Sequence, residues 1–230
     1  MEQNFSASGT APKDTCRRDE AAKASSRKKT VFQKALFIGN SLLLGMGSYG
    51  MCASAPEKDW FARTAAAILQ KNPSAVFDRL HIGKAEQPES PADMQQWFEE
   101  NLAHFLPDLD LIVLQIGDNV TTPRRKELWD AGCSGLLGRI RTQCPRARIL
   151  LMFGWYNYPL CGPALERCAA EYGLETVDIR DLHTKENEGF SGQKYLLPDG
   201  TAAEVKEAWI SHPGDRGMEQ IALRLLQKLN

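Results

Sequence analysis

Four short polar segments of this 230-residue chain contain the residue types that acyl transfer requires. They supply a hydroxyl, a glycine amide, a carboxamide and an imidazole, and they are Gly39-Asn40-Ser41, His81-Ile82-Gly83, Gly117-Asp118-Asn119 and His212-Pro213-Gly214-Asp215. Acyl transfer needs a nucleophile, donors that stabilise an oxyanion, and a base, so these groups match its requirements. Each also has an ordinary structural alternative: a helix cap for Ser41, a loop glycine for Gly83, a turn residue for Asn119 and a surface histidine for His212.

The elements that must position these segments alternate between strand and helix from Val31 onward. Short apolar runs predict strands at residues 35–38, 75–81, 111–116, 148–153 and 175–179. Helices are expected at about residues 54–71, 90–106, 124–143, 163–172 and 215–229. Start signals mark the first, second and last of these helices: Ser54-Ala55-Pro56-Glu57, Ser90-Pro91, and Asp215 as an N-cap. Five strands separated by helices predict one α/β domain with a parallel sheet covered on both faces.

The predicted sheet brings the polar segments together. In an open parallel sheet, ligands bind beyond the carboxyl ends of the strands. The first three segments follow the first three predicted strands, and His212 stands just before the last helix. We therefore expect these side chains to meet at one edge of the sheet.

The same segments resemble the sequence blocks of the SGNH hydrolases, the superfamily of GDSL-like lipases and esterases. Phe37-Ile38-Gly39-Asn40-Ser41 is similar to the first block, with Asn where Asp usually precedes the serine. Gly83 is similar to the second block and Gly117-Asp118-Asn119 to the third, with Val120 where Asp is usual. The segment that begins at His212 resembles the last block.

The resemblance spans residues 35–229 and has consequences for both fold and mechanism. It implies a three-layer α/β/α, flavodoxin-like sandwich with a five-stranded parallel sheet. It also implies that Ser41 is the nucleophile and His212 the general base of a serine esterase. The oxyanion hole would consist of the backbone amides of Ser41 and Gly83 and the side chain of Asn119.

One position departs from the SGNH pattern. The family usually has Asp three residues before the histidine, where it orients the imidazole, and Trp209 stands there in this chain. Loss of the orienting Asp costs about 10⁴ in turnover in the serine-protease template. Three alternatives remain open. A backbone carbonyl holds the ring and leaves a Ser–His dyad, or another acid takes the role, or the protein binds its ligand without cleaving it. The candidate acids are Asp181, Asp199 and Glu207.

The expected substrate is a small O-acyl compound such as an O-acetylated carbohydrate, because the family acts on such esters and on lipids. Trp155 and Tyr156 follow the fourth strand and would form a platform for a sugar ring, with Trp209 adding to its wall, or else pack over the core. A nucleotide-binding enzyme is a rival hypothesis, suggested by Gly45-Met46-Gly47-Ser48-Tyr49-Gly50 and by Asp78 as a ribose-binding acid. That glycine motif neither follows its strand directly nor opens a helix, as the dinucleotide fingerprint requires.

Composition and charge exclude several other classes. Hydrophobic residues make up 43% and charged residues 25% of the chain, as in an ordinary globular protein. The net charge of -1 supplies no overall field for nucleic acid or an anionic membrane, and no apolar run approaches the roughly 20 residues of a membrane span. No group of residues has metal-ligand spacing, so we expect neither a metal nor another cofactor. The expected partner is a small-molecule ester or acetylated glycan, and the oligomeric state stays open.

The first 30 residues have no periodic apolar pattern and predict a disordered tail or an expression remnant, followed by one domain over residues 31–230. They also lack the apolar centre of a secretory signal. The chain as written is therefore expected in the cytoplasm, or outside the cell if a signal has been removed. The six cysteines are expected to be free and mostly buried thiols rather than a disulfide framework.

Overall fold

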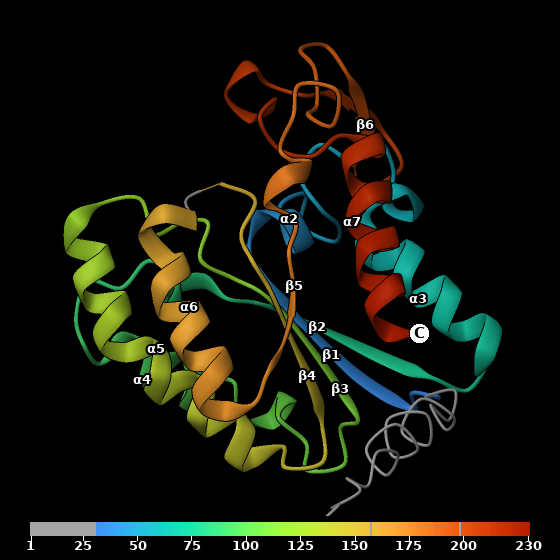
Figure 1. The fold of residues 1–230 in the computed structure, drawn as a ribbon. Helices are drawn as coiled ribbons and strands as arrows, with labels where there is room; N and C mark the ends of the chain where they lie inside the picture. Colours follow the sequence, from blue (N-terminus) through green and yellow to red (C-terminus); the bar gives the residue numbers. More distant parts are fainter. Residues whose placement is uncertain (1–30, 157, 198) are drawn as a thin grey trace, which may run out of the picture. The chain divides into compact units, whose positions relative to one another are not determined.

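Five parallel strands form the centre of the fold in the computed structural model, which describes residues 31–156, 158–197 and 199–230 (Figure 1). Their order across the sheet is β2-β1-β3-β4-β5. They are β1 (Lys34–Gly39), β2 (Val76–His81), β3 (Leu111–Gln115), β4 (Arg148–Met152) and β5 (Glu175–Val177). Every neighbouring pair runs parallel, so the predicted five-stranded parallel sheet is confirmed.

Helices cover both faces of the sheet (Figure 1). On one side lie α4 (Asp93–Glu100), α5 (Pro123–Gln143) and α6 (Tyr158–Tyr172), and on the other lie α3 (Trp60–Lys71) and α7 (Asp215–Leu229). Successive residues of a strand point to opposite faces. Accordingly, Leu36 and Ile38 of β1 belong to one buried apolar cluster, whereas Ala35 and Phe37 belong to the other. The structure confirms the three-layer α/β/α sandwich.

Short elements surround the carboxyl ends of the strands. Helix α2 (Ser41–Leu44) follows β1 directly, and a turn of 3₁₀ helix, η2 (Gly83–Ala85), follows β2. The polar stretch 180–211 contains the antiparallel hairpin of β6 (Lys194–Leu196) and β7 (Ala202–Glu204). It also contains the 3₁₀ turns η4 (Arg180–Leu182) and η5 (Glu207–Trp209). The sequence pattern predicted none of these short elements.

One predicted helix start, near residue 54, is wrong, and so is the predicted N-cap role of Asp215, although α7 begins where it was expected. Helix α3 begins at Trp60, where the Asp59 side chain accepts from the Ala62 amide at 2.6 Å, and only a 3₁₀ turn, η1 (Pro56–Lys58), precedes it. Ser54 donates its amide (2.8 Å) and hydroxyl (2.6 Å) to the carboxylate of Asp215 instead. Asp215 is thus the first residue of α7 and binds Ser54 rather than capping its own helix.

The bounds of two further helices differ from the prediction. Helix α4 ends at Glu100 and is followed by a separate 3₁₀ turn, η3 (Leu102–His104), instead of continuing to residue 106. Ser90 does not cap α4: its hydroxyl donates to Asp93 at 2.6 Å. Helix α6 begins at Tyr158, five residues before the expected start, with Pro163 inside it.

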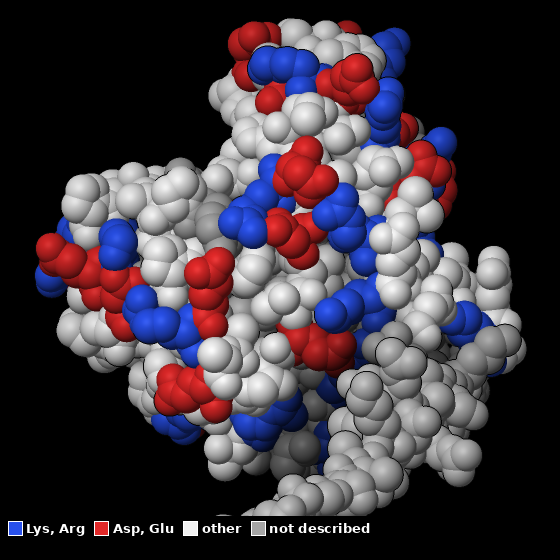
Figure 2. Space-filling view, in the orientation of Figure 1, with Lys and Arg blue, Asp and Glu red and all other residues white. Residues whose placement is uncertain are grey.

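The surface charge, the extent of the compact unit and the cysteines agree with the composition of the chain. Acidic and basic side chains are interspersed across the face shown in Figure 2, as the near-neutral net charge suggests. Residues Val31–Asn230 form one compact unit, and the predicted tail at residues 1–30 lies outside the described residues. Within the described part, no helix is long and apolar enough to cross a membrane. The five cysteines there are free and buried.

Candidate active site

Ser41 and His212 lie in direct contact although 171 positions separate them. The distance from Ser41 Oγ to His212 Nε2 is 2.9 Å. Ser41 begins α2 immediately beyond the carboxyl end of β1, and the cap of this helix is Asn40, whose side chain accepts from the Leu42 amide at 3.1 Å. The Ser41 hydroxyl is therefore not used as the helix cap and is available to the imidazole.

A backbone carbonyl orients the His212 ring. His212 Nδ1 lies 2.9 Å from the carbonyl oxygen of Trp209. A carbonyl only accepts hydrogen bonds, so Nδ1 carries the proton and Nε2 is left to accept from the Ser41 hydroxyl. Burial lowers the pKa of His212 below its ordinary value, although the bond to the carbonyl partly opposes this, and the neutral form of the ring is thereby favoured.

The three acids considered as replacements for the missing Asp do not contact His212. Asp181 holds Arg224 through two bonds of 3.0 Å, and Asp199 accepts from the hydroxyl of Thr201 at 2.7 Å. Glu207 is exposed in the 3₁₀ turn that precedes His212. Of the alternatives left open by the sequence, the backbone carbonyl is the contact that the ring makes.

Cys52 contacts the same carbonyl oxygen. Its buried thiol donates to the Trp209 oxygen at 3.0 Å. Its φ of 69° lies in the left-handed region, which is uncommon for a residue other than glycine. The backbone amide of His212 also donates to this oxygen at 2.9 Å. The carbonyl that orients the imidazole is thus tied to the loop after α2 and to the turn that carries His212.

Asn119, the predicted side-chain oxyanion donor, is held by a residue that the motif analysis missed. Its Nδ2 donates to Glu86 Oε2 at 2.8 Å. The other carboxylate oxygen of Glu86 accepts from Asn40 Nδ2 at 3.0 Å and from the Gly117 amide. The only sequence signal for this residue is an acidic side chain three positions after Gly83, which by itself is ordinary loop composition.

Glu86 is a fully buried carboxyl group, and burial raises its pKa to about 7, with a further contribution from nearby Asp118. The hydrogen bonds from Asn119, Asn40 and Gly117 act in the opposite direction and favour the charged form. Asp118 is also buried and accepts from Gln115 Nε2 at 2.7 Å and from the Tyr156 amide. Two carboxyl groups therefore lie beneath the ends of β1 and β3.

Gly83, the other predicted donor, lies beyond the end of β2 in the left-handed conformation, with φ 52°. Its amide donates to His81 Nδ1 at 3.0 Å. In this arrangement the amide already has an acceptor, so His81 must turn away before Gly83 could donate to a substrate oxygen.

Of the two alternatives for the aromatic loop, a sugar platform or packing over the core, Trp155 adopts the second. Trp155 is 1% exposed, packs in the core and donates Nε1–H to the carbonyl of Ser211 at 2.8 Å, so its ring offers no free face to a ligand. Tyr156 packs edge-on against the His212 ring, with 5.5 Å between centroids. The indole of Trp209 lies against Tyr195 and beneath the ammonium group of Lys206.

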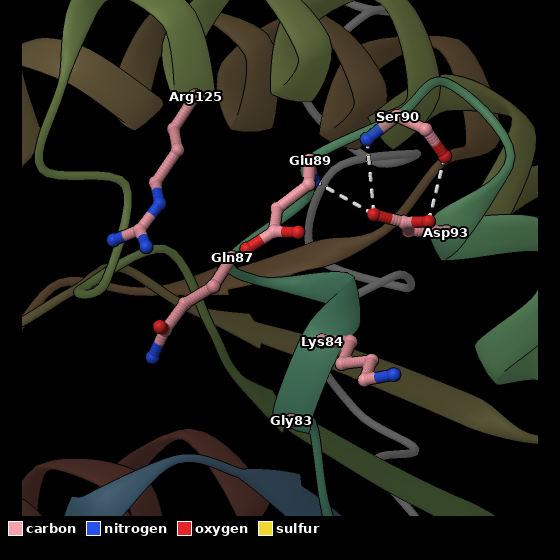
Figure 3. A pocket seen from close by; sticks show the side chains of 7 residues that line it. All are labelled: Gly83, Lys84, Gln87, Glu89, Ser90, Asp93 and Arg125. Carbon is pink, nitrogen blue, oxygen red and sulfur yellow. Dashed lines mark hydrogen bonds between the residues drawn. The ribbon is translucent and has the colours of Figure 1, made fainter.

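A pocket of about 530 Å³ begins at Gly83 (Figure 3). Arg125 reaches it from α5, while Gln87 and Glu89 come from the loop after η2. Asp93 accepts from the hydroxyl of Ser90 and from the amides of Ser90 and Glu89. The lining is polar and carries both signs of charge, which suits a neutral hydroxylated molecule such as a sugar.

The remaining sequence motifs do not form a site. The glycine run 45–50 follows helix α2 rather than a strand, and Asp78 binds His104 at 2.5 Å instead of pointing to a nucleotide. No group of three metal-ligating side chains occurs among the described residues.

Comparison with known proteins identifies the fold. No family model and no curated protein matches the sequence. Among solved structures, the chain is similar to phospholipase A1 from Streptomyces albidoflavus, with 15% identity, a TM-score of 0.53, and coverage of 86% of this chain and 100% of that one. It is also similar to a Bacteroides ovatus protein described as a GDSL-like lipase, with 12% identity, a TM-score of 0.52, and coverage of 87% and 99%. The chain has the fold of the GDSL-like lipases and esterases.

A third similar structure is that of an esterase rather than a lipase or phospholipase. An acetyl xylan esterase from the rumen bacterium Butyrivibrio proteoclasticus is 14% identical, with a TM-score of 0.51, and the match covers 87% of this chain and 64% of that one. The resemblance to the SGNH superfamily that the sequence blocks predicted is confirmed as a likeness of fold.

Proposed function

We propose that this protein is a serine esterase in which Ser41 and His212 form a catalytic dyad. The observation that carries the proposal is the 2.9 Å contact between Ser41 Oγ and His212 Nε2 at the carboxyl edge of a GDSL-like fold. With the Trp209 carbonyl bound to His212 Nδ1, the contact completes a hydrogen-bonded chain of a nucleophile (Ser41), a base (His212) and an orienting group.

The reaction would proceed through an acyl-enzyme. His212 Nε2 takes the proton of Ser41 as Oγ bonds to the ester carbonyl carbon, and the carbonyl oxygen becomes an oxyanion. The Ser41 amide and the Asn119 side chain stabilise this charge, joined by the Gly83 amide once His81 releases it. The imidazolium then gives its proton to the departing alcohol as the bond between that alcohol and the carbonyl carbon breaks. In the second half His212 takes a proton from water, whose oxygen bonds to the acyl carbon, and returns it to Ser41 Oγ as the acyl–Oγ bond breaks and the acid is released.

We expect the missing Asp to cost less here than its removal costs in a serine protease. In that template the Asp-to-Asn change lowers turnover about 10⁴-fold because the histidine adopts the wrong tautomer. The Trp209 carbonyl can only accept, so it enforces the productive tautomer, with the proton on Nδ1. What the carbonyl lacks is the full negative charge that stabilises the imidazolium. We therefore expect turnover that is reduced but clearly above background.

The substrate class that the site favours is a small O-acyl ester of a hydroxylated compound, such as an O-acetylated carbohydrate. The polar pocket that begins at Gly83 would hold the alcohol portion, with Arg125 and Gln87 as hydrogen-bond donors. The likeness to an acetyl xylan esterase supports this class, although phospholipase A1 shares the same fold.

The test is hydrolysis of p-nitrophenyl acetate and butyrate by the wild type, Ser41→Ala and His212→Ala. Ser48→Ala and His104→Ala are matched controls, because Ser48 is exposed, the half-buried His104 pairs with Asp78, and both lie outside the site. We expect turnover in the wild type and both controls, and background rates in the two site variants. Equal rates in the wild type and Ser41→Ala would refute the dyad.

A further inference from the structure

Glu86 joins the ends of two strands that carry different parts of the site. Its Oε1 accepts from Asn40 Nδ2, next to the nucleophile, and from the amide of Gly117, and its Oε2 accepts from Asn119 Nδ2 at 2.8 Å. The side chain is completely buried. A single carboxylate therefore receives three donors from the segments after β1 and β3.

The chemistry of a carboxylate fixes which way the Asn119 amide points. An ionised carboxylate only accepts, so the group that faces it must be Nδ2 and not Oδ1. One N–H of Asn119 is then bound to Glu86, and the second N–H of the same nitrogen is left to another acceptor. A neutral apolar or donor group at position 86 would leave the amide free to rotate or would reverse it.

We propose that Glu86 is a positioning residue that holds the Asn119 carboxamide ready to donate to the substrate oxyanion. The proposal rests on the proposed esterase function and deepens it, because Glu86 itself does not touch the reacting atoms. It acts through Asn119 and, by way of Asn40, steadies the first residue of the loop that presents Ser41.

The ionisation state of Glu86 controls this contact. Protonation converts one carboxylate oxygen into a donor, and at least one of the three N–H groups then loses its acceptor. The buried carboxyl group of Asp118 raises the pKa of Glu86 by charge repulsion. The neighbouring Cys161 thiol stays neutral, because burial raises its pKa to about 12. With the pKa of Glu86 at about 7, the contact would weaken as the pH falls through neutrality.

The contact can be measured without any catalysis. We would follow the side-chain NH₂ signals of Asn119 and Asn40 in ¹⁵N-labelled protein by NMR between pH 5.5 and 8.5, assigned with Asn119→Ser and Asn40→Ser. We expect both signals to shift with one shared midpoint near pH 7, and the transition to vanish in Glu86→Gln. An Asn119 signal that does not move in the wild type, or that moves equally in Glu86→Gln, would overturn the proposal.

Kinetics then test the positioning role. Loss of one oxyanion donor lowers kcat about 10²- to 10³-fold. We expect Glu86→Gln to lower kcat at least tenfold with little change in KM, and Glu86→Gln/Asn119→Ala to be no slower than Asn119→Ala alone. The control is Glu175→Gln, which removes an ion pair with Arg148 at the opposite end of the sheet and should leave kcat and the Asn119 signal unchanged.

The outcomes separate this proposal from the proposed function. If turnover depends on Ser41 but Glu86→Gln keeps full kcat, the positioning role is overturned and the esterase stands. If the wild type shows no Ser41-dependent turnover, the esterase and the catalytic use of Glu86 both fail, while the NMR transition still decides whether Glu86 holds Asn119.

Discussion

Cys52 and His212 donate to one acceptor, the backbone carbonyl of Trp209, at 3.0 and 2.9 Å. The oxygen that contacts His212 Nδ1 is thus held in place by a buried thiol whose own backbone adopts a left-handed conformation. Unusual backbone conformations persist where the surrounding structure over-determines them, and they concentrate at functional sites. The position of the histidine therefore depends on a loop that follows α2, far from His212 in the sequence.

Replacing the Cys52 thiol tests this support. We expect Cys52→Ala to lower kcat several-fold, because the Trp209 carbonyl loses a donor and the imidazole loses part of its orientation. Cys52→Ser keeps a donor and should retain most of the activity. The measurement is kcat on p-nitrophenyl acetate, with circular dichroism to confirm that each variant is folded. Equal activity in the alanine and serine variants and the wild type would show that the thiol has no part in positioning the ring.

The Trp209 side chain should matter much less than its main chain. The indole packs against Tyr195 and Lys206, whereas the contact with His212 uses the carbonyl oxygen. We expect Trp209→Phe to keep Ser41-dependent turnover within about threefold of the wild type, since a phenyl ring retains most of the packing. A drop to the level of Ser41→Ala would mean instead that the indole itself contacts the substrate.

The pH dependence should reveal two groups. Burial lowers the pKa of His212, so the base becomes neutral, and active, at a pH below the ordinary histidine value of about 6.5. Ionisation of Glu86, with a pKa of about 7, should raise the rate further as the pH increases. We expect kcat/KM to rise in two steps between pH 5 and 8 in the wild type. In Glu86→Gln only the lower step should remain, and a surviving step near pH 7 would assign it to another group.

The general position of the site could be predicted from the sequence, because it depends on topology. Apolar runs located the five strands, and parallel strands place their carboxyl ends at one edge. Ser41, Gly83 and Asn119 follow three of those ends, and this placement suffices to bring Ser41 to within hydrogen-bond distance of a residue before the last helix.

The supporting contacts could not be predicted because they join residues that are distant in the chain. Glu86 gains its role from three donors on two other segments, none of which a local pattern reveals. The Ser54 capping signal failed for the same reason, since its hydroxyl binds Asp215, 161 positions away. The sequence left open whether Trp155 forms a platform or packs over the core, and only the packing of the folded chain shows that it is a core residue.

The contact between Ser54 and Asp215 should contribute to stability, because it joins the segment before α3 to the start of α7. Asp215 accepts two hydrogen bonds from Ser54, at 2.8 and 2.6 Å, in a half-buried position. Hydrogen bonds to a charged group each contribute about 1.5–3 kcal/mol, and removing the acceptor also leaves the Ser54 amide unpaired. We expect Asp215→Ala to lower the free energy of unfolding by about 2 kcal/mol, measured by urea denaturation. Ser54→Ala should cost less, because it keeps the amide, and the double variant should cost less than the sum of the two. Strict additivity would show that the two side chains stabilise the protein independently.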